Sequence, residues 1–508
     1  AVAAGYVLLQ KAGWDITDWR QAGGTKPTFP IGTLGNSAFT ASFVGMASPF
    51  VVYRALSSRA LKRLFWGFVL VGILGALWFT GGRAGMLGGA AGIVAIPLFM
   101  SRLRPLRKAA LVLLTIVALM VVPVVFGDPT DTQRTAPLRT GTAGYRVQIW
   151  DASWRMFLNR PVLGWGPETF YGNYPRFRTA DEARRQGLAI SDKPHNIYLG
   201  WATSTGAVGV VAYVLLFGTA LLLVAQRVTK LDATRRLLAA TFGAGLVAYL
   251  VQGVYSIDVP PLLFLGWISL GGIAVLVNRR GEPSAGGEAV LDADPTNAAA
   301  GDEGGARRRR IDVPALRRGW VLPTAVGTLV LLLISFGFGP LRADHAAWAG
   351  ERRAALGWSS DTMELYEKAI SLNPREAAYR GLAGSYLERI ASNRATPFPQ
   401  ATALRRSAAM YLQALDLQPR NVYFMINAAR VYARLGRSED KKYFPRGDRL
   451  MGQAVTLDPL NPQMRDLYTD LLNQWQKELK GRQQREVLNR ARTQAGIAQQ
   501  LRAGRVIR

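Results

Sequence analysis

Long runs of apolar residues, about 17 to 25 each, recur along this chain, and they match the length that a helix needs to cross a bilayer. No other feature of the sequence constrains the fold as strongly. The runs lie near residues 36–53, 64–80, 85–100, 109–126, 197–225, 237–256, 260–277 and 320–339, and residues 1–10 resemble the end of another. Since neither an initiator Met nor a signal-peptide pattern precedes them, we expect earlier spans to be missing. The predicted fold class is all-α, a polytopic transmembrane helical bundle.

The basic residues are concentrated in particular connections between these runs. The chain holds 62 Lys and Arg against 34 Asp and Glu, a net charge of +28. The positive-inside rule places the most basic connections in the cytoplasm, namely 54–63, 101–108, 226–236 and 278–319. By alternation the outward segments are then 11–35, 81–84, 127–196, 257–259 and everything after 341. Topology thus explains the charge, and we expect no nucleic-acid partner.

Composition divides the chain into consecutive parts. Residues 1–278 are expected to form the transmembrane domain, which includes a large outer loop at 127–196. Residues 279–319 are largely small and polar, have nothing to bury, and predict a disordered cytoplasmic linker. The parts that follow are an additional transmembrane helix at 320–340, an outward-facing helical repeat domain at 341–480 and a basic C-terminal tail at 481–508.

The repeat domain is predicted from three similar segments, 366–374, 411–419 and 451–459. Each begins with an aromatic residue or Met, has a central Ala and ends in Pro. The pattern resembles tetratricopeptide repeats over roughly residues 350–475, with insertions, because the ideal repeat is about 34 residues long. Stacked helix pairs of this kind leave a concave groove. A partner-binding role and a simple spacer or dimer contact both fit this pattern.

Two arginines on the predicted outer side stand out. Arg83 lies in "TGGRAG" and is the exception to the charge rule, since the other basic residues near short connections face inward. Such an Arg either contacts lipid phosphates or binds an anionic ligand. Arg146 lies at the start of a helix-like stripe with apolar residues at 145, 147, 149, 150, 154, 157 and 158. The loop's other arginines are expected to lie on a solvent-exposed face; they are Arg155, Arg160, Arg176, Arg178, Arg184 and Arg185.

His195 is one of only two histidines in the chain, and it lies where a polar loop meets an apolar run. Asp192 or Ser191 is expected to cap a helix there, which puts His195 on its first turn. The positive end of the helix dipole favours a neutral imidazole, and a neutral imidazole can act as a general base. The alternative is a structural hydrogen bond. The other histidine, His345, is predicted to lie on the surface.

Several other chemistries lack the residues that they need. The chain has no Cys, two His and no clustered carboxylates on the predicted outer side, so no metal site is expected. Neither a GxxxxGK phosphate loop nor a GxSxG nucleophile motif is present. We therefore expect no cofactor.

Four segments together resemble the superfamily of O-antigen ligases and polymerases, which includes bacterial protein O-oligosaccharyltransferases. They are "GTLGNSAFTASFV" (32–44), "TGGRAGMLG" (80–88), "YRVQIWDASWRMFLNRPVLGWGPETF" (145–170) and "HNIYLGWATSTGAVGVVAYV" (195–214). The resemblance implies a metal-independent, inverting glycosyltransferase of the bacterial cytoplasmic membrane. It would move a glycan from an undecaprenyl-diphosphate carrier to a hydroxyl on a glycan, lipid or protein acceptor at the outer face.

The resemblance also implies roles for three residues. Arg83 and Arg146 would bind the diphosphate, and His195 would be the catalytic residue that activates the acceptor hydroxyl. The appended repeats, which are not general in the family, suggest a protein partner. The competing hypothesis is a non-catalytic scaffold that assembles an envelope complex through its repeats.

Overall fold

The computed structural model describes residues 1–15, 27–126, 141–278, 321–357, 360–392 and 399–504. The described residues form helices joined by turns and loops, without a β-strand. They divide into two compact units, which are described separately below. The first unit comprises residues 1–280 with 457–464 and 497–508, and the second comprises 281–456 with 465–496. The predicted linker at 279–319 and residues 127–140 of the predicted outer loop lie outside the described residues.

Five helices in the described residues are long and apolar enough to cross a membrane. They are α2 (Ser37–Ser57), α3 (Ala60–Thr80), α4 (Arg83–Met100), α9 (Ile197–Arg227) and α11 (Pro260–Asn278). All five coincide with predicted apolar runs, and the chain is a multi-pass membrane protein. Three further predicted runs are helical as well, in α5 (Pro105–Phe126), α10 (Ala233–Gln252) and α12 (Val321–Ala355). Residues 1–10 fall in α1 (Val2–Lys11).

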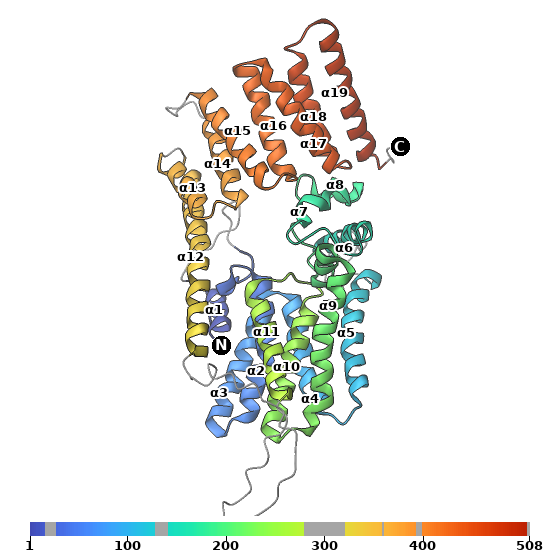
Figure 1. The fold of residues 1–508 in the computed structure, drawn as a ribbon, viewed down its shortest axis with the longest axis vertical. Helices are drawn as coiled ribbons and strands as arrows, with labels where there is room; N and C mark the ends of the chain where they lie inside the picture. Colours follow the sequence, from blue (N-terminus) through green and yellow to red (C-terminus); the bar gives the residue numbers. More distant parts are fainter. Residues whose placement is uncertain (16–26, 127–140, 279–320, 358–359, 393–398, 505–508) are drawn as a thin grey trace, which may run out of the picture. The chain divides into compact units, whose positions relative to one another are not determined.

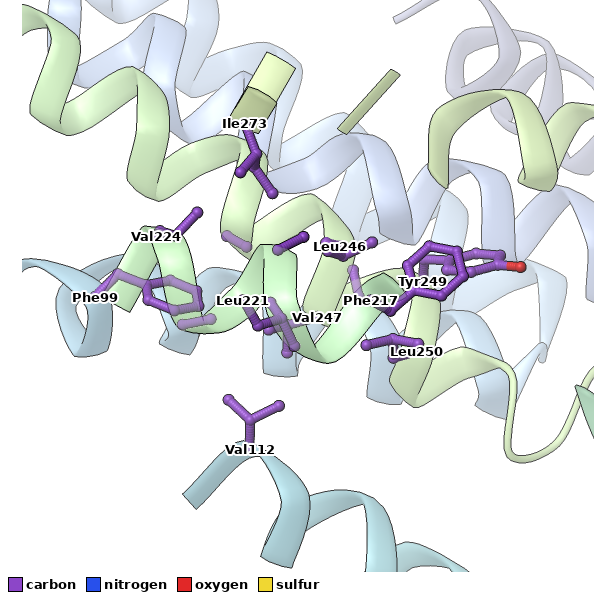
Figure 2. Close-up of a cluster of buried hydrophobic side chains, with 14 of the residues drawn as sticks. Phe99, Val112, Phe217, Leu221, Val224, Leu246, Val247, Tyr249, Leu250 and Ile273 are labelled. Atoms are coloured by element: carbon purple, nitrogen blue, oxygen red, sulfur yellow. The ribbon is translucent and has the colours of Figure 1, made fainter. Parts of the chain in front are cut away.

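Helix α10 is the central helix of the first unit, and α2, α4, α9 and α11 run beside it (Figure 1). Its positions from Ala239 to Gln252 are buried with few exceptions. Figure 2 shows the resulting core, in which Phe99, Phe217 and Leu246 come from three different helices. By contrast, α3 exposes a row of large apolar side chains such as Phe68, as expected for a helix that faces lipid. Packing in the bundle fixes the positions of three helix ends, the first residues of α4 and α9 and the last residues of α10, where the candidate site residues lie.

Helix α6 (Gly141–Asn159) confirms the helix predicted in the outer loop and is followed by the short helices α7 (Phe170–Asn173) and α8 (Ala180–Gln186). Its buried face agrees with the predicted stripe only in part, since Ile149 and Trp150 of that stripe are buried. Ile149, Ala152 and Met156 are completely buried, whereas Trp154 and Leu158, both in the predicted apolar stripe, are more than half exposed. The buried residues Ile149, Ala152 and Met156 follow one another at spacings of three and four residues, as on one face of a helix. The prediction missed part of this face because it counted exposed aromatic residues such as Trp154 as buried.

The second unit contains α12 and the helices that follow it in succession. The helices after α12 are α13 (Ser360–Leu372), α14 (Ala377–Ile390), α15 (Gln400–Leu417), α16 (Val422–Ser438), α17 (Phe444–Leu457), α18 (Pro462–Gln476) and α19 (Gly481–Arg502). Residues 457–464 and the end of α19 from residue 497 group with the first unit. Helix α19 covers most of the predicted basic tail at 481–508.

The three similar segments form the C-terminal parts of α13, α15 and α17, and another helix follows each of them. Their first residues, Tyr366, Tyr411 and Met451, are each 1% exposed. Their central alanines, Ala369, Ala414 and Ala454, are completely buried. Equivalent positions therefore have equivalent packing roles in three helix pairs, while their identity as tetratricopeptide repeats stays a prediction.

Candidate functional site

Arg83 is the first residue of α4. Helix α3 ends at Thr80, and Gly81 and Gly82 form the turn between the two helices. The side chain of Arg83 is exposed, while Ala84 and Gly85 directly behind it are buried against the bundle. Gly85 packs so tightly on α2 that a Cβ there would lie 2.2 Å from the carbonyl carbon of Ala41. Close helix packing therefore fixes the backbone from which Arg83 projects.

Arg146 lies on α6 and is half-buried. Burial lowers the pKa of Arg146, the positive charge of Arg83 lowers it further, and Tyr255 raises it. A guanidinium stays charged at neutral pH despite such shifts. In the described part of the chain Arg146 forms no ion pair with a carboxylate. Two neighbouring guanidiniums, one of them partly desolvated, make a region that attracts an anion.

His195 lies directly before α9 and not on its first turn, so the predicted capping by Ser191 or Asp192 is wrong. The N-cap is Asn196, whose side-chain oxygen accepts a hydrogen bond from the Leu199 amide at 3.0 Å. Ser191 instead donates to the Lys193 carbonyl at 2.8 Å. His195 adopts φ 53°, a left-handed conformation that is uncommon for residues other than glycine. The helix therefore begins only after Asn196, whose own backbone is extended (φ −154°, ψ 118°).

The imidazole of His195 is half-buried beside Arg146. Burial lowers the pKa of His195, and the charge of Arg146 lowers it further, whereas Asp192 acts in the opposite direction. The neutral ring predicted from the helix dipole is thus favoured for different reasons, namely desolvation and a neighbouring cation. Arg83, Arg146 and His195, which are spread over 113 residues of sequence (83 to 195), are brought together.

Contacts from α6 and from the turn after α10 hold the His195 segment in place. The indole Nε1 of Trp150 donates to the Pro194 carbonyl at 3.1 Å, one turn along α6 from Arg146. The Ile197 amide donates to the Gly253 carbonyl at 2.8 Å. The rings of Trp150 and Tyr255 lie 6.0 Å apart, between their centroids. The residues before and after His195 are therefore tied to different elements.

Sequence reasoning predicted the outward connection at 257–259 but missed the residues that the turn between α10 and α11 brings to the site. This turn supplies Tyr255, which lies near Arg146, and Asp258, which accepts a hydrogen bond from the Tyr249 hydroxyl at 3.0 Å. Burial raises the pKa of Asp258 to about 6, although the bond from Tyr249 and the charge of Lys193 lower it. The available signal was a lone carboxylate in "YSIDVPP", between two apolar runs.

The arginines of the outer loop are not all solvated as predicted. Arg155 is partly exposed and pairs with Asp151 at 2.6 Å. Arg178 is 1% exposed. Its Nε donates to Asp458 of the same compact unit at 2.9 Å, and its other nitrogens donate to the carbonyls of Gly187 and Ala189. The solvated interpretation of Arg178 is therefore wrong.

The site offers two guanidiniums, one imidazole and one carboxyl group of raised pKa. Among the described residues, no group of three His, Asp or Glu side chains gathers closely enough to hold a metal ion. His345, the other histidine, is exposed as predicted.

Most of the described site falls within a segment that matches a known protein family. Residues 68–214 match the family described as O-Antigen ligase. The matched segment contains Arg83, Arg146 and His195. No curated protein matches the chain.

Proposed function

We propose that the chain is a membrane glycosyltransferase that acts on a lipid-linked glycan, because residues 68–214 match the O-antigen ligase family. The donor is a glycan on an undecaprenyl-diphosphate carrier. The acceptor is a hydroxyl at the outer face of the bacterial cytoplasmic membrane. The observation that carries the proposal is the proximity of Arg83, Arg146 and His195.

The two arginines bind the diphosphate of the donor. A guanidinium is always charged and presents paired N–H groups that match phosphate oxygens. Arg146 has no carboxylate partner among the described residues, so its charge is available to a ligand. As the glycosidic bond to phosphate breaks, negative charge develops on the leaving diphosphate, and donors preorganised around that charge lower the barrier.

His195 is the general base. Its neutral imidazole accepts the proton of the acceptor hydroxyl while the oxygen attacks the anomeric carbon from the face opposite the diphosphate. The new carbon–oxygen bond forms as the bond to phosphate breaks, so the anomeric configuration inverts. The lowered pKa of His195 keeps the base unprotonated at neutral pH. The products are the glycosylated acceptor and the undecaprenyl diphosphate. No metal ion takes part in this reaction.

The helix pairs of the second unit recruit the acceptor or a protein that delivers it. Their repeated packing positions support an extended binding surface of the kind that stacked helix pairs form.

A transfer assay in membranes tests the proposal. Membranes that contain the protein are supplied with a radiolabelled lipid-diphosphate glycan and an extract of envelope glycans, lipids and proteins. The expected result is label transferred to an acceptor with inverted anomeric configuration, lost in the His195→Ala variant. If the native protein transfers no label but still assembles with envelope proteins through residues 341–480, it is a scaffold and the enzymatic proposal is wrong.

A further inference from the structure

Helix α9 is interrupted at Gly206. This residue has φ 67° and ψ −164°, a backbone conformation that is essentially restricted to glycine. The interruption lies 11 residues after His195 (206 − 195) and divides α9 into a short first part and a long apolar second part. Such a break leaves backbone donors and acceptors without their helical partners, which is costly wherever water is scarce.

Residues 160–166, called the clamp loop below, supply the missing partners. The amides of Trp165 and Gly166 donate to the carbonyls of Thr203 and Ser204 at 2.8 and 2.9 Å, on one side of the break. On the other side, the amides of Ala207 and Val208 donate to the carbonyls of Pro161 and Val162 at 2.7 and 3.3 Å. The loop is therefore hydrogen-bonded to the broken segment on both sides of Gly206.

Two glycines make this contact possible. A Cβ on Gly206 would lie 2.2 Å from the Val162 carbonyl oxygen, and a Cβ on Gly164 would lie 2.7 Å from the Gly206 amide nitrogen. Both glycines also have positive φ values. Because each approaches the other's backbone, any side chain at Gly206 would push the clamp loop away.

The clamp loop is also attached to α6. The indole Nε1 of Trp165 donates to the Met156 carbonyl at 2.8 Å. The guanidinium of Arg160 lies 4.2 Å from the centre of the Trp165 ring, within the range of a cation–π interaction. The loop therefore connects the end of α6 to the break in α9. A second connection, from Trp150 to Pro194, joins the other half of α6 to the start of α9.

We propose that the clamp loop, hydrogen-bonded into the break of α9, is a positioning element that holds Arg146 at its working distance from His195. Arg146 lies on α6 and His195 lies directly before α9, so two separate attachments between these helices fix both their spacing and their relative rotation. Gly206 and Gly164 are the positioning residues. This inference rests on the proposed function, in which the diphosphate and the acceptor hydroxyl must be held side by side.

The first experiment replaces Gly206 with Ala. A misplacement of about 1 Å in an active site can lower the rate on the order of 10²-fold, so we expect a kcat loss of that order in Gly206→Ala. The KM for the lipid donor should change less than about threefold, because each arginine still binds phosphate. Gly218→Ala is the matched control, since it lies in the same helix with nothing within 4 Å of its added Cβ, and it should keep native kcat.

The second experiment measures the geometry without using activity. The chain has no natural Cys, so Val162→Cys/Val208→Cys gives a single pair across the clamp. Both side chains are more than half exposed, and their backbones are hydrogen-bonded. We expect efficient disulfide formation on oxidation, native turnover in the oxidised form, and little cross-linking when Gly206→Ala is added.

The outcomes separate this inference from the proposed function. Native kcat in Gly206→Ala, or activity lost on oxidation and recovered on reduction of the Cys pair, would overturn the clamp while leaving the glycosyltransferase in place. If the unmodified protein transfers no glycan, the function fails and the positioning role fails with it.

Discussion

The indole Nε1 of Trp150 donates a hydrogen bond to the carbonyl oxygen of Pro194, 44 residues further along the chain. Both residues are buried. Arg146 lies one helical turn before Trp150, and His195 directly follows Pro194. This bond thus ties the turn of α6 that carries Arg146 to the segment that carries His195.

Replacing Trp150 with Phe should remove this bond while keeping an aromatic ring in the same place. A buried carbonyl that loses its donor costs about 1–3 kcal/mol, so we expect a lower unfolding midpoint together with reduced turnover. Thermal unfolding in detergent and the transfer assay measure the two effects. Trp154→Phe, on the exposed face of the same helix, is the control and should change neither. Equal effects at the two positions would mean that the bond has no special role.

The arginines should not tolerate Lys. Losing one hydrogen bond to a charged group costs about 1.5–3 kcal/mol, or roughly 10- to 100-fold in rate, so Arg83→Lys and Arg146→Lys should lose most activity. A lysine keeps the charge but not the paired donors. Arg155→Lys should be nearly silent, because Arg155 already pairs with Asp151. Initial rates at saturating donor measure the effect. A similar loss at all three positions would indicate that the arginines act through a general positive potential and do not form a specific diphosphate-binding site.

The sequence predicted the fold class because apolar runs of membrane-spanning length leave few alternatives. Its helices α2, α3, α4, α9 and α11 are where such runs were expected. It did not predict the break in α9, since a glycine in an apolar run is compatible with a continuous helix. The break at Gly206 depends on the close approach of the clamp loop, which is distant in sequence from α9's first turns and leaves no local signal. The burial of Arg178 was missed for the same reason, because its partner Asp458 lies 280 residues away.

The candidate site was predictable where residue type alone carries information. Arg83 violates the charge rule, and His195 is a rare residue at the end of a loop. Trp150, Tyr255 and Asp258 were missed because their contribution lies in contacts with distant backbone or rings, and such contacts leave no periodic pattern. The cap of α9 was misplaced by a few residues because Ser191, Asp192 and Asn196 are all good N-cap residues.

Asp258 gives a prediction about stability and pH. Its pKa is raised to about 6 in the folded protein, against an ordinary value of about 3.9. The folded state thus binds this proton more tightly, so the associated stability is present below about pH 4 and is lost as the pH rises through about 6. Asp258→Asn resembles the protonated form and should lose less stability on going from pH 5 to pH 7.5 than the native protein. Unfolding midpoints across this range measure it, and parallel curves would contradict the assignment.

The orientation of the chain is testable with single cysteines, since the sequence contains none. Cysteines at Arg176 and Arg420 are expected outside and should react with an impermeant thiol reagent in intact cells. Those at Lys230 and at Pro295, which lies outside the described residues, should react only after permeabilisation. Labelling of position 295 in intact cells would overturn the alternation argument and with it the outward location of the helix pairs.

The general base gives the most specific prediction. A positioned base contributes about 10²- to 10⁴-fold in rate, so His195→Gln should lower kcat within that range while the KM for the lipid donor stays near native. His345→Ala, which changes the exposed histidine of the second unit, should have no effect.

The pH dependence of the native enzyme follows from the same residue. Only neutral His195 can take the proton, so activity should fall as the pH decreases through the pKa of His195. Burial and Arg146 both lower that pKa, so the acid limb should lie below the ordinary value of about 6.5. Replacing Arg146 with Gln removes the neighbouring charge and should move the limb of the residual activity upward. If His195→Gln keeps native turnover with an unchanged acid limb, the imidazole is a structural group and another residue must take the proton.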